Sequence, residues 1–349
     1  MEWAKRHPRS RLSLAGSNLL ACELTDLPGA REWLELCGDN DNGYAPLAEA
    51  IASRYGVARD MVVTAQGTSG ANFLAFAALV HAGDDVLVER PGYDPLMGPV
   101  ALLGGRVTRF DRRFEDGYRL DPDAVRAAMT PRTKLIVITN AHNPTGVIAP
   151  DADIEAVGRM AEDHGALVLV DEVYLDTAAN PVKPAATKSR VFVSTSSLTK
   201  SYGLAGLRCG WALTPPDVAE SIRRARDIVD GTGAFPAERL SVLAFSLLDR
   251  LAARAHRLIE ANGRTVRAFL ESRPELQYVL PAAGTVVFPR IRGIEDCGAF
   301  VQRLAREFET DLVPGRFFQA PAHFRLGFGG RPDLLAEGLD QLGKALDDR

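Results

Sequence analysis

The chain has 349 residues, 46% of them hydrophobic and 25% charged, so it can bury a sizeable core and more than one domain. A formal net charge of -4, with both signs interspersed, gives no extended basic field and argues against nucleic acid or an anionic membrane as the main partner. The four cysteines lie far apart, without a CxxC pair or a nearby histidine cluster, so neither a metal site nor a disulfide framework is expected.

The amino terminus superficially imitates a secretion signal, because basic residues precede the apolar stretch Leu12–Cys22. Ser13, Gly16, Ser17 and Asn18 interrupt that stretch, so it lacks the continuous apolar segment that a signal peptide requires. No other apolar run approaches the length that spans a bilayer. We therefore expect a cytoplasmic protein with no membrane partner.

Between about residues 60 and 213, short runs rich in β-branched residues alternate with longer amphipathic runs. The expected strands are Met61–Thr64, Asp85–Glu89, Arg106–Phe110, Leu135–Thr139, Leu167–Asp171, Val191–Ser194 and Cys209–Leu213. The expected helices between them include Ser69–His81, Asp94–Leu103, Asp121–Met129 and Asp151–His164. Such alternation is typical of an α/β fold, in which helices cover a mostly parallel sheet.

The rest of the chain mixes helices and strands without strict alternation, which favours a smaller α+β domain. Its expected helices are Pro216–Val229, Pro236–Phe269 and Cys297–Thr310, and its expected strands are Tyr278–Leu280, Thr285–Pro289 and His323–Phe328. We expect residues 38–232 to form a large domain and residues 1–37 and 233–349 to form a small one.

Candidate functional residues directly follow the expected strands. Ligands of open parallel sheets bind beyond the carboxyl ends of the strands, so these residues should meet in one site. Gly67, Thr68 and Ser69 follow the first strand and precede a helix, whose free N–H groups and dipole favour an anion. A plain turn with Ser69 as the helix cap is the alternative interpretation.

Three further loops add aromatic, amide and carboxylate groups. Tyr93 lies between two prolines on a rigid turn, from which its ring can stack on another ring. Asn143, in an Asn-Pro-Thr-Gly loop, can point its amide at a ligand hydroxyl. Asp171 ends an apolar strand, where a carboxylate needs a cationic partner such as a protonated pyridine nitrogen.

The segment from Ser197 to Gly210 offers a lysine, Lys200, with hydroxyls on both sides, several glycines and Arg208. A lysine amine condenses reversibly with an aldehyde, while hydroxyls, backbone N–H groups and a guanidinium bind a phosphate dianion. The cofactor that needs both is pyridoxal 5′-phosphate. Taken alone, the segment could also be an ordinary Gly-rich turn with a solvated lysine, and the other motifs of the chain favour the cofactor.

The ordered set Gly-Thr-Ser-Gly-Ala, Pro-Gly-Tyr, Asn-Pro-Thr-Gly, Asp-Glu-Val-Tyr and Ser-Leu-Thr-Lys-Ser-Tyr-Gly-Leu-Ala-Gly-Leu-Arg-Cys-Gly resembles the fold type I pyridoxal-phosphate enzymes, specifically the class I/II aminotransferases. The resemblance runs from about Leu12 to the end of the chain. It implies a large domain with a mostly parallel seven-stranded sheet, flanked by helices, and a small domain built from both termini.

The resemblance also implies roles for the residues that match its motifs. Lys200 would bind the cofactor aldehyde as an imine, and Asp171 would partner the pyridine nitrogen. Tyr174 and Asn143 would hydrogen-bond the phenolate oxygen, and Tyr93 would stack on the ring. The residues that would hold the phosphate are Gly67, Thr68, Ser69, Ser197 and Arg208.

Two further positions concern the substrate and a second subunit. Arg325 matches the arginine that receives the substrate α-carboxylate, with Asn143 beside it. Tyr44 matches a residue that reaches the phosphate of the neighbouring subunit, which implies a homodimer with shared active sites. The implied reaction moves an amino group from an L-amino acid to a 2-oxo acid by a ping-pong mechanism, with the freed Lys200 amine as the base.

Substrate specificity stays open at this point. Two segments depart from the common pattern of the family, namely Ala282-Ala283-Gly284-Thr285 and Pro314–Phe318. In relatives, these two segments approach the substrate side chain. Arg9, Arg11 or Arg316 would favour an acidic side chain. The alternatives are a histidinol-phosphate-type aminotransferase, a carbon–sulfur β-lyase of the same fold and, remotely, an aminotransferase-like ligand-sensing regulator.

Overall fold

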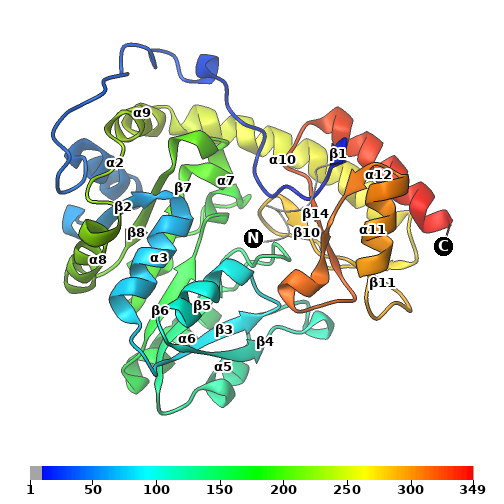
Figure 1. Cartoon of the computed structure of the whole chain (residues 1–349), viewed down its shortest axis with the longest axis horizontal. Helices are drawn as coiled ribbons and strands as arrows, with labels where there is room; N and C mark the ends of the chain where they lie inside the picture. The colour runs from blue at the N-terminus through cyan, green and yellow to red at the C-terminus, as the bar shows by residue number, and fades with distance from the viewer. Residues whose placement is uncertain (1–9, 349) are drawn as a thin grey trace.

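The structure is a computed structural model that describes residues 10–348. Figure 1 shows two lobes, with a central sheet in the larger lobe and helices α11 (Gly298–Glu307) and α12 (Pro332–Asp347) in the smaller one. The long helix α10 (Leu248–Glu271) runs from one lobe to the other. Arg9, one candidate for recognising an acidic substrate, lies outside the described residues.

The sheet of the large lobe has seven strands in the order β2-β8-β7-β6-β5-β3-β4. Strand β8 runs antiparallel to both of its neighbours, and the other pairs are parallel, which confirms the expected fold class. The strands are β2 (Val62–Gln66), β3 (Asp85–Arg90), β4 (Arg106–Asp111), β5 (Thr133–Thr139), β6 (Leu167–Asp171), β7 (Phe192–Ser197) and β8 (Cys209–Leu213).

Successive side chains of the strands point to opposite faces of the sheet and bury two separate cores. In β5, Leu135 and Val137 pack with Phe76 of α3 (Gly67–Leu79) on one face. Ile136 and Ile138 pack on the other face, in a core to which several helices contribute, among them α2 (Ala45–Tyr55), α5 (Pro122–Ala128), α6 (Asp151–His164) and α9 (Phe235–Ser246). Helix α8 (Pro216–Val229) joins α3 on the first face.

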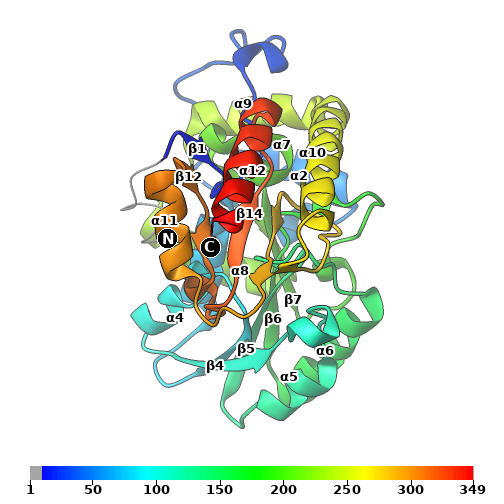
Figure 2. The ribbon, with the colours of Figure 1, turned by 90° about the vertical axis from the view of Figure 1, so that its right-hand side faces the viewer.

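The small lobe has its own core under α11 and α12, which face the viewer in Figure 2. Its central strand β14 (Phe324–Gly327) pairs with β10 (Val286–Val287) and with β13 (Val313–Pro314). Two further pairs flank it: β1 (Leu12–Ser13) with β12 (Thr310–Asp311), and β9 (Leu276–Gln277) with β11 (Arg290–Ile291).

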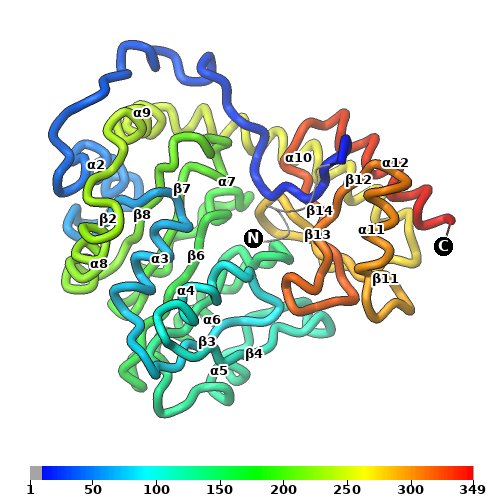
Figure 3. Tube along the Cα trace, viewed as in Figure 1, coloured from blue at the N-terminus to red at the C-terminus, as the bar shows by residue number. Residues whose placement is uncertain are grey.

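Both lobes share α10 and the N-terminal segment. Leu251 near the start of α10 belongs to the core of the large lobe, and Leu270 near its end belongs to the core of the small lobe. Figure 3 shows the N-terminal segment leaving β1, arching over α10 and α9, and descending to α2. The domain boundaries at residues 38–232 stay a prediction.

Three expected elements differ from the structure. The helix expected at Asp94–Leu103 is a 3-10 turn, Asp94–Leu96, followed by the short helix α4 (Gly98–Leu102), because Pro99 begins a new helix and has no N–H to continue the first. The helix expected at Pro236–Phe269 is interrupted at Leu247, between α9 and α10. Tyr278–Leu280 is not a strand, since β11 pairs with the residues just before it.

Helices α2 and α12, together with the short α7 (Leu198–Tyr202), are not among the expected elements. Within residues 10–348, no helix has both the length and the apolar character to cross a membrane. In the same range no group of three histidine, cysteine, aspartate or glutamate side chains is arranged to hold a metal ion.

Candidate active site

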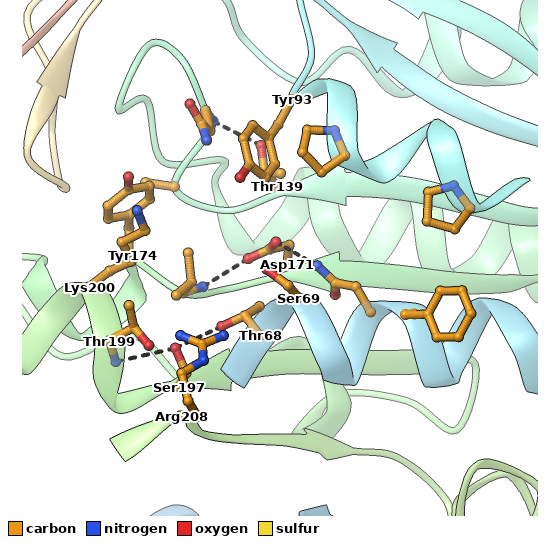
Figure 4. Close-up of a pocket in the computed structure, with 17 residues that line it drawn as sticks. Thr68, Ser69, Tyr93, Thr139, Asp171, Tyr174, Ser197, Thr199, Lys200 and Arg208 are labelled. Atoms are coloured by element: carbon orange, nitrogen blue, oxygen red, sulfur yellow. Dashed lines mark hydrogen bonds between the residues drawn. The ribbon is translucent and has the colours of Figure 1, made fainter. Parts of the chain in front are cut away.

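A pocket lies at the carboxyl edge of the sheet, where β2, β5, β6 and β7 end. Figure 4 shows side chains from these loops converging on it. Nine of the predicted site residues line this one pocket: Thr68, Ser69, Tyr93, Asn143, Asp171, Tyr174, Ser197, Lys200 and Arg208. The sheet therefore brings together motifs that are spread over some 140 residues of the sequence, as the carboxyl-edge argument requires.

Lys200 lies on α7, whose first turn is capped by Ser197: the Ser197 hydroxyl accepts a hydrogen bond from the Thr199 N–H at 3.3 Å. Burial, reinforced by the nearby positive charge of Arg325, lowers the pKa of the Lys200 amine to about 7. Near neutral pH a substantial fraction of this amine is uncharged and able to act as a nucleophile or a base.

Asp171 ends β6 as a buried carboxylate. Its Oδ2 accepts a hydrogen bond from the Asn72 amide at 2.8 Å, and its Oδ1 accepts one from the Val173 N–H at 3.2 Å. The Thr195 hydroxyl donates to Asn72 Oδ1, which orients the amide so that its N–H groups face Asp171. Burial raises the pKa of Asp171, so a cationic partner would favour its ionised form.

The opposite end of the pocket is rich in hydrogen-bond donors. The Thr68 hydroxyl donates to the Ser197 hydroxyl at 2.8 Å, and the Arg208 guanidinium donates to the Gln66 carbonyl at 3.2 Å. Gly67 has a φ of +72°, and a Cβ there would lie 2.4 Å from an Arg208 nitrogen, so the close approach of this turn to Arg208 requires glycine. The buried Thr199 hydroxyl has no hydrogen-bond partner among residues 10–348.

Tyr93 and Tyr174 face the pocket from different loops. Burial raises the pKa of Tyr93 to about 12 and also raises the pKa of Tyr174, so both phenols stay protonated at neutral pH. The Thr139 hydroxyl accepts a hydrogen bond from the Asn143 N–H at 2.9 Å, and buried Glu89 accepts one from the Thr139 N–H at 2.7 Å. The loop that carries Asn143 is therefore fixed from beneath.

Arg325 lies on β14 of the small lobe and reaches the edge of the pocket through Asn143. Its guanidinium donates to Asn143 Oδ1 at 3.2 Å and to the Ala15 carbonyl at 3.1 Å, and it lies over the Phe318 ring, 5.1 Å from the centroid. The side chain is 7% exposed, and its Nε has no hydrogen-bond partner in the described part of the chain. A buried guanidinium with a free donor is well suited to bind a carboxylate.

Other predicted residues lie outside the pocket of their own chain. Tyr44 caps α2 and makes an edge contact with Phe235, with ring centroids 5.2 Å apart. Arg11 pairs on the surface with Glu309 and Glu337 at 3.2 and 2.7 Å, so the structure gives no support to its recognising an acidic substrate.

Arg316 does not line the pocket either; its guanidinium lies 5.1 Å from the centroid of the Phe317 ring.

Several residues that shape the site were not predicted from the sequence. Asn72 and Thr139 support Asp171 and Asn143, and the Lys200 amine donates hydrogen bonds to Ser17 and Asn18. The helical position of Asn72, one turn after the Gly-Thr-Ser turn, was a readable signal. Ser17 and Asn18 gave none, because nothing in the local sequence connects them with a lysine more than 180 residues away.

Comparison with known proteins decides the family. Residues 35–342 match the family described as aminotransferase class I and II. The chain belongs to this family. It is therefore a pyridoxal-phosphate-dependent aminotransferase, which confirms the expected activity and cofactor.

Individual relatives agree with the family match. The chain is 32% identical to a capreomycidine synthase of Streptomyces vinaceus, over 82% of this chain and 74% of the relative. It is 30% identical to a probable N-succinyldiaminopimelate aminotransferase of Mycobacterium tuberculosis, over 86% and 82% of the two chains. A crystal structure of a pyridoxal-phosphate-dependent aminotransferase from Streptococcus suis matches with a TM-score of 0.92 and 26% identity, over 97% and 94% of the two chains.

The residues of this class I/II aminotransferase fit the cofactor. A buried carboxylate at Asp171 suits a protonated ring nitrogen, and the hydroxyls of Thr68 and Ser197 with Arg208 suit a phosphate. Asp171 and the candidate phosphate-binding residues line the same pocket, and Lys200 lines it as well. The Thr199 hydroxyl, which is buried and has no hydrogen-bond partner in the part of the chain that the structure describes, is a further donor available to a phosphate.

Proposed function

We propose that this aminotransferase moves an amino group between an L-amino acid and a 2-oxo acid by a ping-pong mechanism, with Lys200 as the base, Asp171 as the counter-charge of the cofactor and Arg325 as the carboxylate receptor. The observation that carries the proposal is the half-buried Lys200 amine, which lines the same pocket as Asp171 and has its pKa lowered to about 7. An amine in that state exchanges protons readily near neutral pH.

Each residue has one task in this scheme. Pyridoxal phosphate, when bound, supplies an aldehyde that condenses with amines and a ring that withdraws electrons. Arg325 binds the substrate carboxylate through its planar fork and so orients Cα toward Lys200. The Nζ atom of Lys200 takes the proton from Cα, and Asp171 stabilises positive charge at the ring nitrogen. The phenol of Tyr174 and the amide of Asn143 hydrogen-bond the cofactor hydroxyl.

The phosphate is held by Gly67, Thr68, Ser69, Ser197 and Arg208 in this proposal. Support comes from the Thr68–Ser197 hydrogen bond and from the position of both residues at the same end of the pocket as Arg208. Ser69 is the third residue of α3, and the N–H groups in the first turn of a helix have no partner within the helix, so they are available to an anion. Tyr93 closes the pocket from the side of β3, in the position from which it would stack on the ring.

The test of this function is the variant Lys200→Ala in the purified protein. We expect loss of the yellow colour that the wild type gains with the cofactor, no label at residue 200 after borohydride reduction, and loss of turnover by at least about a thousandfold. Lys344→Ala is the matched control, since Lys344 is an exposed lysine of α12, far from the pocket in the chain, and its Nζ lies 3.7 Å from Asp340. Normal transamination by Lys200→Ala would overturn the assignment.

The substrate pair is tested with a panel of amino donors and 2-oxo acid acceptors. Release of a 2-oxo acid from the donor without the acceptor, in an amount equal to the enzyme, would support the ping-pong scheme. Ammonia and pyruvate as the products would instead show β-elimination. The names of the relatives give no support to a lyase, a histidinol-phosphate aminotransferase or a regulator.

We also propose that the protein is a cytoplasmic homodimer with shared active sites. The segment that precedes α2 exposes Leu24, Leu34 and Leu36, and the end of α8 exposes Ile228 and Val229. The end of α8 and the part of the N-terminal segment that leads into α2 lie on the large lobe, on the side away from the small lobe (Figure 1). Large exposed apolar side chains on neighbouring segments are typical of a surface that another subunit covers.

A further inference from the structure

The strongest contacts of the Lys200 amine are made with the N-terminal segment. The Nζ atom donates to the Ser17 hydroxyl at 2.8 Å and to the Asn18 side-chain oxygen at 2.6 Å. Both acceptors are neutral, and both come from residues 14–20, here called the N-terminal strap. The hydrogen bonds of Nζ are therefore made to the strap and not to the Asp171 carboxylate, which lies on β6.

The strap is held in place by its own backbone. The Leu14 N–H donates to the Asp311 carbonyl at 3.0 Å, and the Leu14 carbonyl accepts from the Gly327 N–H at 2.7 Å. The Leu20 N–H donates to the Gly329 carbonyl at 2.6 Å. The Ser17 carbonyl accepts from the phenol of Tyr174 at 3.1 Å and from the hydroxyl of Thr285 at 2.9 Å. These bonds fix where the strap presents the Ser17 and Asn18 side chains.

The number of acceptors matches the number of N–H groups on a neutral amine. Such an amine has two N–H bonds and one lone pair. When Ser17 and Asn18 accept hydrogen bonds from both N–H groups, the lone pair of Nζ stays free to take a proton. An amine without these acceptors would rotate about its last side-chain bond, and its lone pair would point at the substrate for only part of the time.

We propose that Ser17 and Asn18 are positioning residues that orient the free amine of Lys200 for proton transfer. The proposal rests on the proposed function, in which Lys200 is the base. It assigns the strap a role in the chemistry in addition to its place beside the carboxylate receptor, where the Ala15 carbonyl accepts a hydrogen bond from Arg325 at 3.1 Å.

The charged groups around Nζ come from other elements and stay unchanged when the strap is altered. Arg325 on β14 and Arg208 before β8 disfavour the ammonium form, whereas Asp171 on β6 favours it, and burial has the largest effect. The Tyr174 ring centroid lies 6.0 Å from Nζ. A substitution at residue 17 or 18 therefore changes the hydrogen-bond acceptors of Nζ and leaves these charges in place.

The test uses the full-length enzyme loaded with pyridoxamine 5′-phosphate, the amine form of the cofactor, in which Lys200 is free. The rate at which an amine-selective acylating reagent modifies Lys200 is measured against pH by peptide mass spectrometry. Ser17→Ala and Asn18→Ala each remove an acceptor that stabilises the ammonium form, so the midpoint should shift to lower pH. Asn18→Asp adds a negative charge, so its midpoint should shift to higher pH.

Turnover supplies the second readout. With orientation lost, kcat should fall about tenfold in Ser17→Ala and Asn18→Ala, with little change in KM. Ser17→Thr keeps a hydroxyl and should retain most of the activity. Ser13→Ala is the matched control, because Ser13 is an exposed serine on β1 just outside the strap. A strap that only supports the fold would change stability or KM and leave the Lys200 midpoint in place.

Equal midpoints in the wild type, Asn18→Ala and Asn18→Asp would overturn this proposal while Lys200→Ala still shows the expected loss of turnover. Conversely, an active Lys200→Ala variant would overturn the proposed function, although the midpoints could still shift. The two failures are therefore distinguishable.

Discussion

The charged side chains of this site are largely withdrawn from water. Among residues 10–348 no group accepts a hydrogen bond from Arg325 Nε, burial raises the pKa of Asp171, and the pKa of Lys200 is lowered to about 7. Burying such groups costs stability, since each loses hydration without a full set of partners. The cost is offset when a ligand that carries a carboxylate, a cationic ring nitrogen and a phosphate occupies the pocket.

Arg325 is the residue whose role is most easily separated from the others. Arg325→Ala should lower kcat/KM for amino acid donors by about a hundredfold, and Arg325→Lys by less, because lysine keeps the charge but lacks the planar fork. The measurement compares each amino acid donor with the amine that lacks its carboxylate. Arg316→Ala serves as the control, since Arg316 lies outside the pocket.

Activity toward the amines that lack the carboxylate tests whether Arg325 acts on that group. The wild type and Arg325→Ala should use these amines equally poorly. If the variant lost as much activity toward the amine as toward the amino acid, Arg325 would act on the fold or on the cofactor, and not on the substrate carboxylate.

Among the helices and strands, those whose residue pattern lies within the element itself could be predicted from the sequence. Strand β6 was predicted to the residue, because Leu167–Val170 is apolar on both faces and ends in a carboxylate. Helix α7 was missed because it is a single five-residue element rich in hydroxyls. Helix α12 was readable, since Leu335, Leu339, Leu342 and Leu346 have helical spacing, and all four are buried.

The site residues, too, could be predicted only where the nearby sequence indicates their position. Residues that directly follow a strand, such as Asp171 and Asn143, could be placed from the sequence, because the sheet brings strand ends together. The strap residues Ser17 and Asn18 could not, since their place beside Lys200 is set by backbone hydrogen bonds to the small lobe. Their polar character was visible only as a break in an apolar run.

Helix α10 joins the two cores, and this arrangement predicts how the protein unfolds. Leu251 and Leu270 are both 1% exposed, one in each core, and about 28 Å apart along the helix at the usual rise per residue. Leu251→Ala and Leu270→Ala should each lower the free energy of unfolding by about 2–5 kcal/mol. Because the helix is unbroken, we expect one cooperative transition in both variants.

The measurement is urea denaturation followed by circular dichroism at saturating cofactor, so that ligand binding is the same in each sample. The double variant should show the sum of the two losses, since the sites share no partners at that separation. Arg257→Ala, at an exposed position of α10, should change little. Two separate transitions, only one of them shifted by Leu270→Ala, would show that the lobes unfold independently.

At the scale of the whole molecule, the pocket of one chain is open where a second subunit is proposed to reach it. Ser69 lines the pocket and is exposed, whereas Tyr44 lies on the large lobe against Phe235, outside the pocket of its own chain. A residue that serves a neighbour's site must lie outside the pocket of its own chain, as the half-buried Tyr44 does. The shared-site proposal therefore predicts that defects in different subunits can complement each other.

Complementation is tested by mixing two inactive or weakened variants, Lys200→Ala and Tyr44→Ala. In a hybrid dimer, the chain that carries Tyr44→Ala still has Lys200, and it receives an intact Tyr44 from its partner, so one of the two sites is whole. Equal mixing and random exchange should restore about a quarter of the wild-type sites. Activity is measured at a cofactor concentration that leaves the Tyr44→Ala variant alone unsaturated, after exchange in mild denaturant. If Tyr44 acted within its own chain, every site in the mixture would keep one defect, and the mixed sample would be no more active than the average of its two components.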